Sequence, residues 1–192
     1  EASGTMTVEA LAATVAAACE AEGVEHMVTG AFAYSYYGIP RSTKDVDVVL
    51  SFAGDDPIRR VVARLEGIVE FEPQVQFDTL TWGRRQVGTT RGSPPFKVEL
   101  FELFDDPFVL EQFARKRRLF SPQLGCATWL PTPEDVIVQK LRWGRSKDLD
   151  DARDVLAVQG PETLDMAYIK AWCARHGTTA RLEAALAGIP PM

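Results

Sequence analysis

The sequence predicts an α+β protein: a mixed β-sheet flanked by helices, followed by a C-terminal helical bundle. Two observations support this fold class. Up to about residue 130, segments with the two-residue apolar alternation of strands are interspersed with segments of helical periodicity, whereas from residue 132 onward only helical patterns remain. We therefore expect an α/β domain over residues 1–130 and a helical region over residues 131–192 that packs on it.

The first part begins with a helix that ends at Gly23. The polar stretch "WGRRQVGTTRGSPP", residues 82–95, is rich in glycine and charged side chains and is predicted to be a loop region. In chain order, the other elements expected are a helix over 8–22, a strand at 25–29, a short helix after Gly30, a strand at 45–51, a helix at 56–67, extended chain at 68–77 and a strand at 96–103.

The second part shows clear helix start and stop signals. "TPEDVIVQKLRWG" has Thr132 as N-cap, a proline at the first helical position and Gly144 as its stop. "SKDLDDARDVLAVQGP" repeats this pattern with Ser146 as the expected N-cap and Gly160 as the stop. Two more helices are expected near residues 164–175 and 179–187.

Composition excludes several classes of protein. The 192 residues are 46% hydrophobic and carry a formal net charge of −6, which argues against bulk electrostatic coating of nucleic acid. A basic run at residues 115–118 is interpreted as a solvated face. Three widely spaced cysteines indicate neither a disulfide framework nor a zinc site and favour a reducing cytoplasm. No apolar stretch is long enough to cross a membrane, so no membrane partner is expected.

Two carboxylates stand one residue apart in "RSTKDVDVVL". Alternation along a strand places Asp45 and Asp47 on one face and the apolar valines on the other, so two negative charges are held together. Such a pair, preceded by a glycine turn at Gly30 that opens a helix, suits one or two Mg²⁺ ions bridging nucleotide phosphates. This combination indicates nucleotidyl transfer.

At these residues the chain resembles the nucleotidyltransferase superfamily with the polymerase β-like fold, whose hallmark is a glycine turn followed by Asp-x-Asp. The block "GIPRSTKDVDVVL", with "TPEDVIVQKLRWGRSKDLDDARDVL" downstream, is most similar to the minimal and AbiEii-type branch, which includes toxins of toxin–antitoxin systems. The resemblance covers most of residues 28–156. It implies Mg²⁺ or Mn²⁺ as cofactor, a nucleoside triphosphate as substrate and a cognate antitoxin as partner.

The third carboxylate of such a site is expected on the strand "FKVELFEL", which offers Glu99 and Glu102. Glu99 lies between apolar neighbours, where an unpaired charge is costly, and we predict it as metal ligand or general base beside Asp45 and Asp47. The alternative is an edge strand with two solvated acids.

Other residues are candidates for binding the nucleotide. Lys140 falls on an apolar helical stripe, where an ammonium reaching triphosphate oxygens would explain it, although a buried stem with its head in water is the alternative. The helix after it presents Asp148 and Asp151 on one face, while Leu149, Ala152 and Leu156 are expected to pack inward. The full predicted nucleotide-binding set is Gly30, Ala31, Arg41, Thr43, Lys44, Lys140, Lys147 and Asp148.

The sequence thus predicts a metal-dependent nucleotidyltransferase that moves a nucleoside monophosphate to a hydroxyl of RNA, protein or a small molecule. Two alternatives stay open. One is a catalytically weak or inactive module that binds a nucleotide or a partner protein, which Ala31 favours because the family's serine hydroxyl is missing there. The other is an aminoglycoside-type drug-modifying enzyme, in which acids near Asp148 would form a pocket for a cationic drug.

Overall fold

The computed structural model of the chain describes residues 6–51, 56–79 and 83–190. The chain forms two compact units: Glu1–Phe32 with Ser42–Leu130, here called the sheet unit, and Ala33–Arg41 with Pro131–Met192, here called the helical unit. Residues 33–41, which belong to the first of the two predicted domains, therefore group with the C-terminal helices. That the helical region packs on the first domain stays a prediction.

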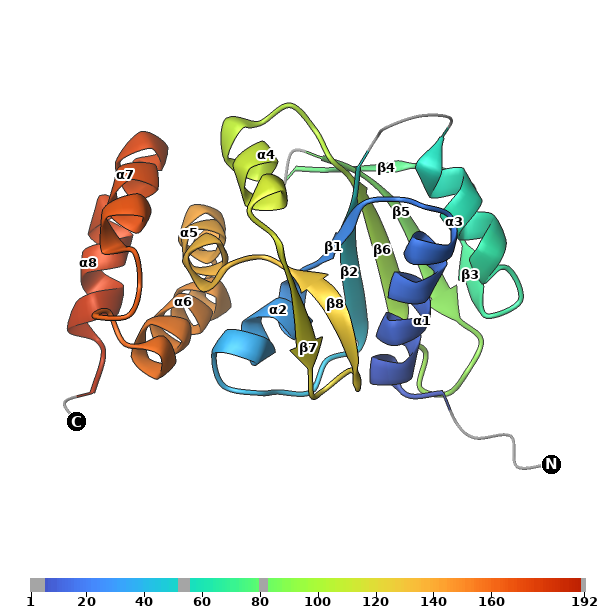
Figure 1. Cartoon of the computed structure of the whole chain (residues 1–192), viewed down its shortest axis with the longest axis horizontal. Helices are drawn as coiled ribbons and strands as arrows, with labels where there is room; N and C mark the ends of the chain where they lie inside the picture. The colour runs from blue at the N-terminus through green and yellow to red at the C-terminus, as the bar shows by residue number, and fades with distance from the viewer. Residues whose placement is uncertain (1–5, 52–55, 80–82, 191–192) are drawn as a thin grey trace. The chain divides into compact units, whose positions relative to one another are not determined.

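The sheet unit alternates helices and strands as expected for an α+β protein (Figure 1). Its main sheet has the order β1-β2-β6-β5-β3, with β4 paired to β5. Only the β2–β6 pair in this sheet is parallel among the described strands. The elements are α1 (Val8–Ala21), β1 (His26–Val28), α2 (Gly30–Tyr37, which continues into the helical unit), β2 (Asp45–Leu50), α3 (Pro57–Leu65), β3 (Val69–Phe71), β4 (Gln76–Asp78), β5 (Gly83–Thr90), β6 (Lys97–Glu102), α4 (Pro107–Ala114), β7 (Arg117–Ser121) and β8 (Cys126–Leu130).

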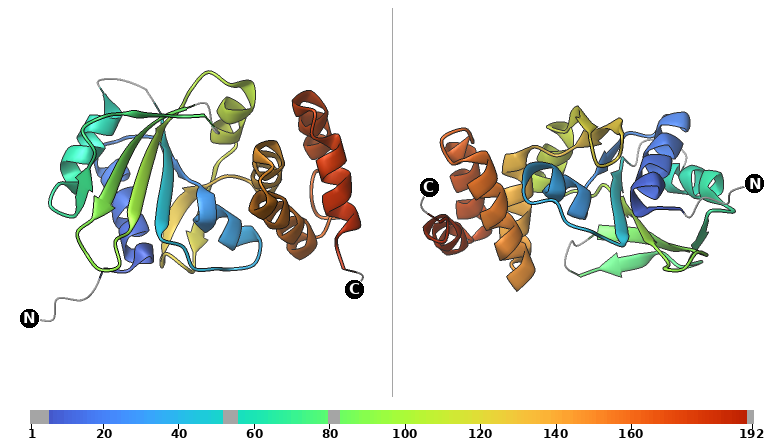
Figure 2. Two further views of the ribbon diagram at one scale, coloured as in Figure 1. Left: turned by 180° about the vertical axis from the view of Figure 1, so that it is seen from behind. Right: turned by 90° about the horizontal axis from the view of Figure 1, so that it is seen from below.

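Helices α1 and α3 lie on the same face of this sheet, as the view from below shows (Figure 2). The apolar positions of the two central strands face them and are fully buried: Val46, Val48, Leu50, Val98 and Leu100. Because side chains alternate along a strand, the residues between these positions point to the opposite face. We call that opposite face the acidic face, defined by Asp45, Asp47, Lys97 and Glu99.

The prediction of a loop over residues 82–95 is wrong for most of its length. Residues 83–90 form β5, the strand next to β6, whereas Trp82 lies outside the described residues. Its charged side chains face acids of the neighbouring strands: Arg84 lies 3.7 Å from Glu102, and Arg85 lies 2.6 Å from Glu99. These ion pairs between strands allow a sequence without apolar alternation to form a central strand.

The β7–β8 hairpin and α4, for which the sequence made no prediction, complete the sheet unit. The basic run at residues 115–118 joins α4 to β7. Two of its side chains form ion pairs with acids near the N-terminal helix: Lys116 lies 3.5 Å from Glu25, and Arg118 lies 3.3 Å from Glu20.

Between residues 131 and 190 the helical unit contains four helices, as predicted: α5 (Pro133–Trp143), α6 (Ser146–Gln159), α7 (Met166–His176) and α8 (Thr179–Ala187). Thr132 caps α5 by accepting the backbone N–H of Asp135, and Gly144 ends it in the left-handed conformation. The expected N-cap of α6 was wrong by one residue. Arg145 is the N-cap. The Asp148 carboxylate accepts hydrogen bonds from the backbone N–H of Arg145 and from its guanidinium.

No helix among the described residues combines the length and the apolar character needed to span a membrane.

Candidate active site

The parallel pairing of β2 with β6 positions the acidic face. Asp45 stands opposite Lys97 and Asp47 stands opposite Glu99 in the register of the two strands. Residues opposite each other on neighbouring strands point to the same face, so three carboxylates and one ammonium share a small area. The structure therefore brings together Asp45, Asp47 and Glu99, the three predicted catalytic residues.

Gly30 lies directly against Asp47 at the start of α2. The backbone N–H of Thr29 donates to the backbone carbonyl of Asp47 over 2.9 Å, which holds the two segments together. A Cβ atom placed on Gly30 would lie 2.1 Å from Asp47 Oδ2, and Gly30 has a φ of +61°. Only glycine accommodates both this backbone conformation and this approach.

We predict that Gly30→Ala destabilises the protein by about 2 kcal/mol or more, from the left-handed backbone and from the overlap with the Asp47 carboxylate. Gly23→Ala is the matched control, because Gly23 has a φ of +64° but nothing within 4 Å of an added Cβ. Urea unfolding measures both variants. Equal losses in the two would show that the approach of Gly30 to Asp47 has no energetic consequence.

The electrostatics of the acidic face are unfavourable for its acids. Burial, together with the charge and hydrogen bond of Glu99 and the charge of Asp45, raises the pKa of Asp47 to about 8. Asp47 Oδ1 is buried and has no hydrogen-bond partner among the described residues. By contrast, the Asp45 side chain is 48% exposed. Of the two acids Asp45 and Asp47, it is thus Asp47 that has no positively charged partner among the described residues.

Two basic side chains of the sheet unit neutralise part of this charge. Lys97 Nζ lies 3.1 Å from Glu99 Oε2 and 3.9 Å from Asp45 Oδ1, and Arg85 Nη1 lies 2.6 Å from Glu99 Oε1. Burial acts to lower the pKa of Lys97, but the hydrogen bond and charge of Glu99 and the charges of Asp45 and Asp47 raise it overall. Lys97 is thus held as a cation.

The donor set fits a divalent cation bound in the manner of Mg²⁺ at a phosphate site. No group of three or more imidazole, thiolate or carboxylate side chains is arranged to hold a metal in the parts of the chain that the structure describes. Mg²⁺ at such sites uses one or two carboxylates, with phosphate oxygens and waters supplying the rest. The unpartnered Asp47 oxygen beside the half-exposed Asp45 matches that requirement.

Three further predicted residues surround the start of β2 or the start of α2. Thr43 Oγ1 accepts the backbone N–H of Asp45 over 3.1 Å, which fixes the first residue of the strand. The carbonyl of Lys44 accepts the backbone N–H of Lys97 over 2.9 Å, and the Lys44 side chain is exposed. Ala31 is half-buried. Their predicted role in binding a nucleotide stays a prediction.

The remaining predicted residues lie in the helical unit. Lys140 is buried and forms ion pairs with Asp148 at 3.4 Å and with Asp151 at 2.8 Å. Arg41 forms an ion pair with Asp151 at 2.9 Å, and Arg145 forms one with Asp148 at 2.6 Å. We call these five side chains the helical ion cluster. Lys147 is exposed on α6.

Ala152 and Leu156 are buried as expected, but the acids on the other predicted face of α6 are buried as well. Leu149 is half-buried, whereas Asp148 is 0% and Asp151 4% exposed. The acids can be buried because the cations around them compensate for lost hydration. Burial opposes ionisation of Asp148, yet the hydrogen bond of Arg145 and the charges of Lys140 and Arg145 lower its pKa.

No protein-family model and no curated protein sequence matches the chain. Solved structures do match it. A solution structure of the antibiotic-resistance factor ANT(2'')-Ia superposes with a TM-score of 0.59 at 13% identity, covering 92% of this chain and 95% of that one. A crystal structure of ANT(2'')-Ia in complex with adenylyl-2''-tobramycin superposes with a TM-score of 0.60 at 14% identity, covering 89% and 99%. The chain has the nucleotidyltransferase fold.

A third neighbour extends this likeness. An antigenic nucleotidyltransferase-like protein from Paracoccidioides brasiliensis superposes with a TM-score of 0.52 at 19% identity, covering 96% of this chain and 94% of that one. At such identities the likeness establishes the fold, and activity has to be argued from the site itself. The fold class predicted from the sequence is confirmed.

Sequence reasoning missed two residues of this nucleotidyltransferase fold that bear on its acidic face. Alternation along the strand puts Lys97 on the face of Glu99, but it does not indicate that Lys97 also lies beside Asp45 of the neighbouring strand. Arg85 was assigned to a loop. The signal for Lys97 was present in "FKVEL", because alternation puts the ammonium and the carboxylate side by side. Nothing local to "GRRQVG" indicates which acid Arg85 meets.

Proposed function

We propose that the chain transfers a nucleoside monophosphate from a nucleoside triphosphate to an acceptor hydroxyl, with a divalent cation held by Asp45 and Asp47. One observation carries the proposal: Asp47 rests against Gly30, beside Asp45 and Glu99, with one buried oxygen that has no hydrogen-bond partner. A carboxylate kept in that state lacks a cation, and a nucleotide with a divalent metal supplies one. The fold supports the same reading.

The acids of the acidic face and the neighbouring Gly30 each have a part in this proposal. Asp45 and Asp47 would hold the cation, which lowers the charge on the phosphates and activates the incoming hydroxyl. Gly30, without a side chain, leaves room for the Asp47 carboxylate at the first turn of α2, where backbone N–H groups would attract a phosphate. The half-exposed Asp45 is the acid that a ligand from solution reaches first. Glu99 stays our prediction for the third acid.

The acceptor is the open part of the proposal. The structural neighbour bound to adenylyl-2''-tobramycin makes an aminoglycoside one acceptor to test. However, Asp148 and Asp151, which were expected to attract a cationic drug, are buried and matched by three cations. The AbiEii-type branch, the toxin role and the antitoxin partner also stay predictions, because the neighbours bear on the fold alone.

One observation favours the alternative of a non-catalytic module. Both oxygens of Glu99 face a cation, since Arg85 lies 2.6 Å from Oε1 and Lys97 lies 3.1 Å from Oε2. A general base needs a lone pair that reaches the proton it abstracts. A module of this fold would bind a nucleotide and release it unchanged.

Thermal unfolding with each of ATP, GTP, CTP and UTP, with and without Mg²⁺, tests the proposal. A ligand at about a hundred times its dissociation constant adds roughly 2.7 kcal/mol to the unfolding free energy, which appears as a clear rise in Tm. We expect one or more nucleotides to stabilise the wild type only with Mg²⁺ and to have no effect on Asp45→Asn.

Glu70→Gln is the control for the loss of one carboxylate, because Glu70 lies on β3 and its side chain is 72% exposed. This variant should respond as the wild type does. If no nucleotide shifts Tm in the wild type, or if Asp45→Asn responds equally well, the proposed site does not exist.

A further inference from the structure

Lys97 occupies a position between two of the acids of the proposed site. Its Nζ lies 3.1 Å from Glu99 Oε2 and 3.9 Å from Asp45 Oδ1. Its side chain is 42% exposed, so the ammonium is accessible from solvent. Because Lys97 stands opposite Asp45 on the neighbouring parallel strand, the two side chains emerge from the sheet side by side.

Glu99 is fixed from its other side. Arg85 Nη1 lies 2.6 Å from Glu99 Oε1 and 3.6 Å from Asp78, so the guanidinium bridges an acid of β6 and an acid of β4. A planar guanidinium held by two acids keeps a defined orientation. Glu99, which is 6% exposed, therefore has Arg85 beside one carboxylate oxygen and Lys97 beside the other.

The contrast with Lys140 decides which lysine is available to a ligand. Lys140, predicted from the sequence to hold the triphosphate, is 5% exposed and has Asp148 and Asp151 as partners. Moving it toward a ligand would break its contacts to two buried carboxylates and leave each with a single arginine partner, which is costly in a buried cluster. Lys97 is half-exposed, and its longer contact, at 3.9 Å, is to Asp45, an acid that a divalent cation would neutralise instead.

We propose that Lys97 is the countercharge of Asp45 in the metal-free protein and binds phosphate oxygens of the nucleotide once a divalent cation has taken that place. The proposal rests on the proposed function and assigns a binding residue to it. A divalent cation bound to Asp45 repels the ammonium of Lys97 and neutralises the carboxylate. The cation therefore weakens the attraction between Asp45 and Lys97. The flexible four-carbon stem lets the ammonium turn toward a phosphate, for which lysine acts as a point charge.

The test uses Lys97→Met, which keeps the length of the stem and removes the charge. Mn²⁺ binding is measured by electron paramagnetic resonance without nucleotide, and binding of ATP at saturating Mg²⁺ is measured by calorimetry. We expect Mn²⁺ alone to bind about fivefold more tightly to the variant, because a competing surface charge is gone. We expect ATP to bind about tenfold more weakly, because a charge-assisted contact is lost.

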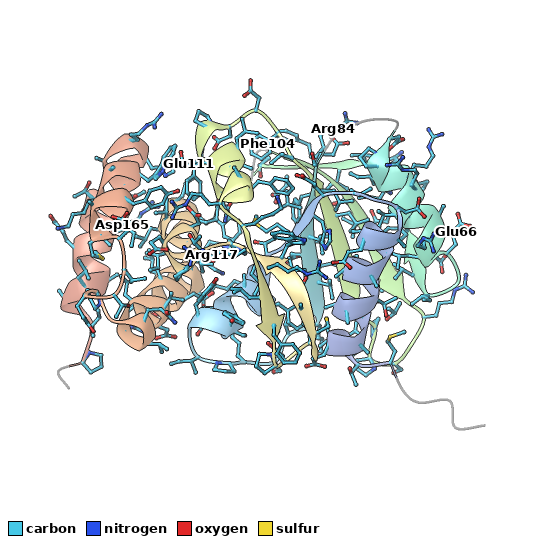
Figure 3. All side chains as sticks on the ribbon, viewed as in Figure 1. Glu66, Arg84, Phe104, Glu111, Arg117 and Asp165 are labelled. Carbon is cyan, nitrogen blue, oxygen red and sulfur yellow. The ribbon has the colours of Figure 1, made fainter. Side chains whose placement is uncertain are left out.

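Opposite changes in the two affinities distinguish this role from a purely structural one, which would weaken both. Lys97→Arg should keep ATP binding near that of the wild type. Arg84→Met is the matched control, because Arg84, labelled in Figure 3, pairs with Glu102 on β6 and its loss also removes one positive charge from the sheet. This control should change neither affinity.

Two outcomes would overturn the inference. If the wild type binds Mn²⁺ and ATP but Lys97→Met changes both in the same direction, or changes neither, Lys97 does not have this role while the proposed function stands. If the wild type binds neither Mn²⁺ nor ATP, the proposed function fails and the inference fails with it.

Discussion

Lys140→Met should destabilise the protein by about 2–3 kcal/mol, because two charged contacts to buried acids are lost while Arg145 and Arg41 each keep one acid paired. Lys140 Nζ lies 2.8 Å from Asp151 and 3.4 Å from Asp148, and both acids are almost fully buried. Methionine fills nearly the same volume, so the loss comes from charge rather than from a cavity. Denaturant unfolding at neutral pH measures it, with Lys170→Met on the exposed side of α7 as control.

A double-mutant cycle identifies the cause of this loss. Each single variant already loses the contact of 2.8 Å between Lys140 Nζ and Asp151, so Lys140→Met combined with Asp151→Asn should lose less than the sum of the two single losses. A loss below about 1 kcal/mol in Lys140→Met would resemble that of an exposed ion pair and would contradict the burial of the helical ion cluster.

Asp47→Asn should stabilise the metal-free protein at pH 8 and weaken Mn²⁺ binding at least about tenfold. The pKa of Asp47 rises from 3.8 to about 8 on folding, so the folded state binds this proton more tightly. The stability from this group is therefore present below about pH 4 and is lost as pH rises toward 8. Asparagine does not titrate, so the variant lacks this decline.

Denaturant unfolding between pH 4 and 9 in the presence of a chelator checks this prediction. The curve of the wild type should fall relative to that of Asp47→Asn over the range from about pH 4 to pH 8. Parallel curves would show that Asp47 ionises normally and that the acidic face does not lack a cation.

The Asp45 and Asp47 pair could be predicted because its signal is local. Alternation in "DVDVVL" places both acids on one face, and the glycine at position 30 precedes a helix, so neighbouring residues determine the arrangement. The structure adds what the spacing does not contain: Asp47 lies against Gly30, and β6 runs parallel beside β2. The strand that carries Glu99 was recognisable, but its neighbour in the sheet was not.

Two of the errors share one physical origin, which is charge compensated by residues distant in sequence. Arg85 belongs to a central strand because it meets Glu99 and Asp78 across the sheet. Asp151 is buried because Arg41, 110 positions away, lies 2.9 Å from it. Patterns of hydropathy predict that such residues are exposed, because a charged side chain without a partner stays in water.

Transfer of label from α-³²P nucleoside triphosphates tests the central claim most directly. The wild type and Asp45→Asn are incubated with each labelled nucleotide, Mg²⁺ and three acceptors in turn: total RNA, cellular protein and an aminoglycoside. The account predicts label on one acceptor, with release of pyrophosphate, in the wild type and at least about a hundredfold less in the variant. Nucleotide binding without label on any acceptor, or equal labelling by both proteins, would contradict it.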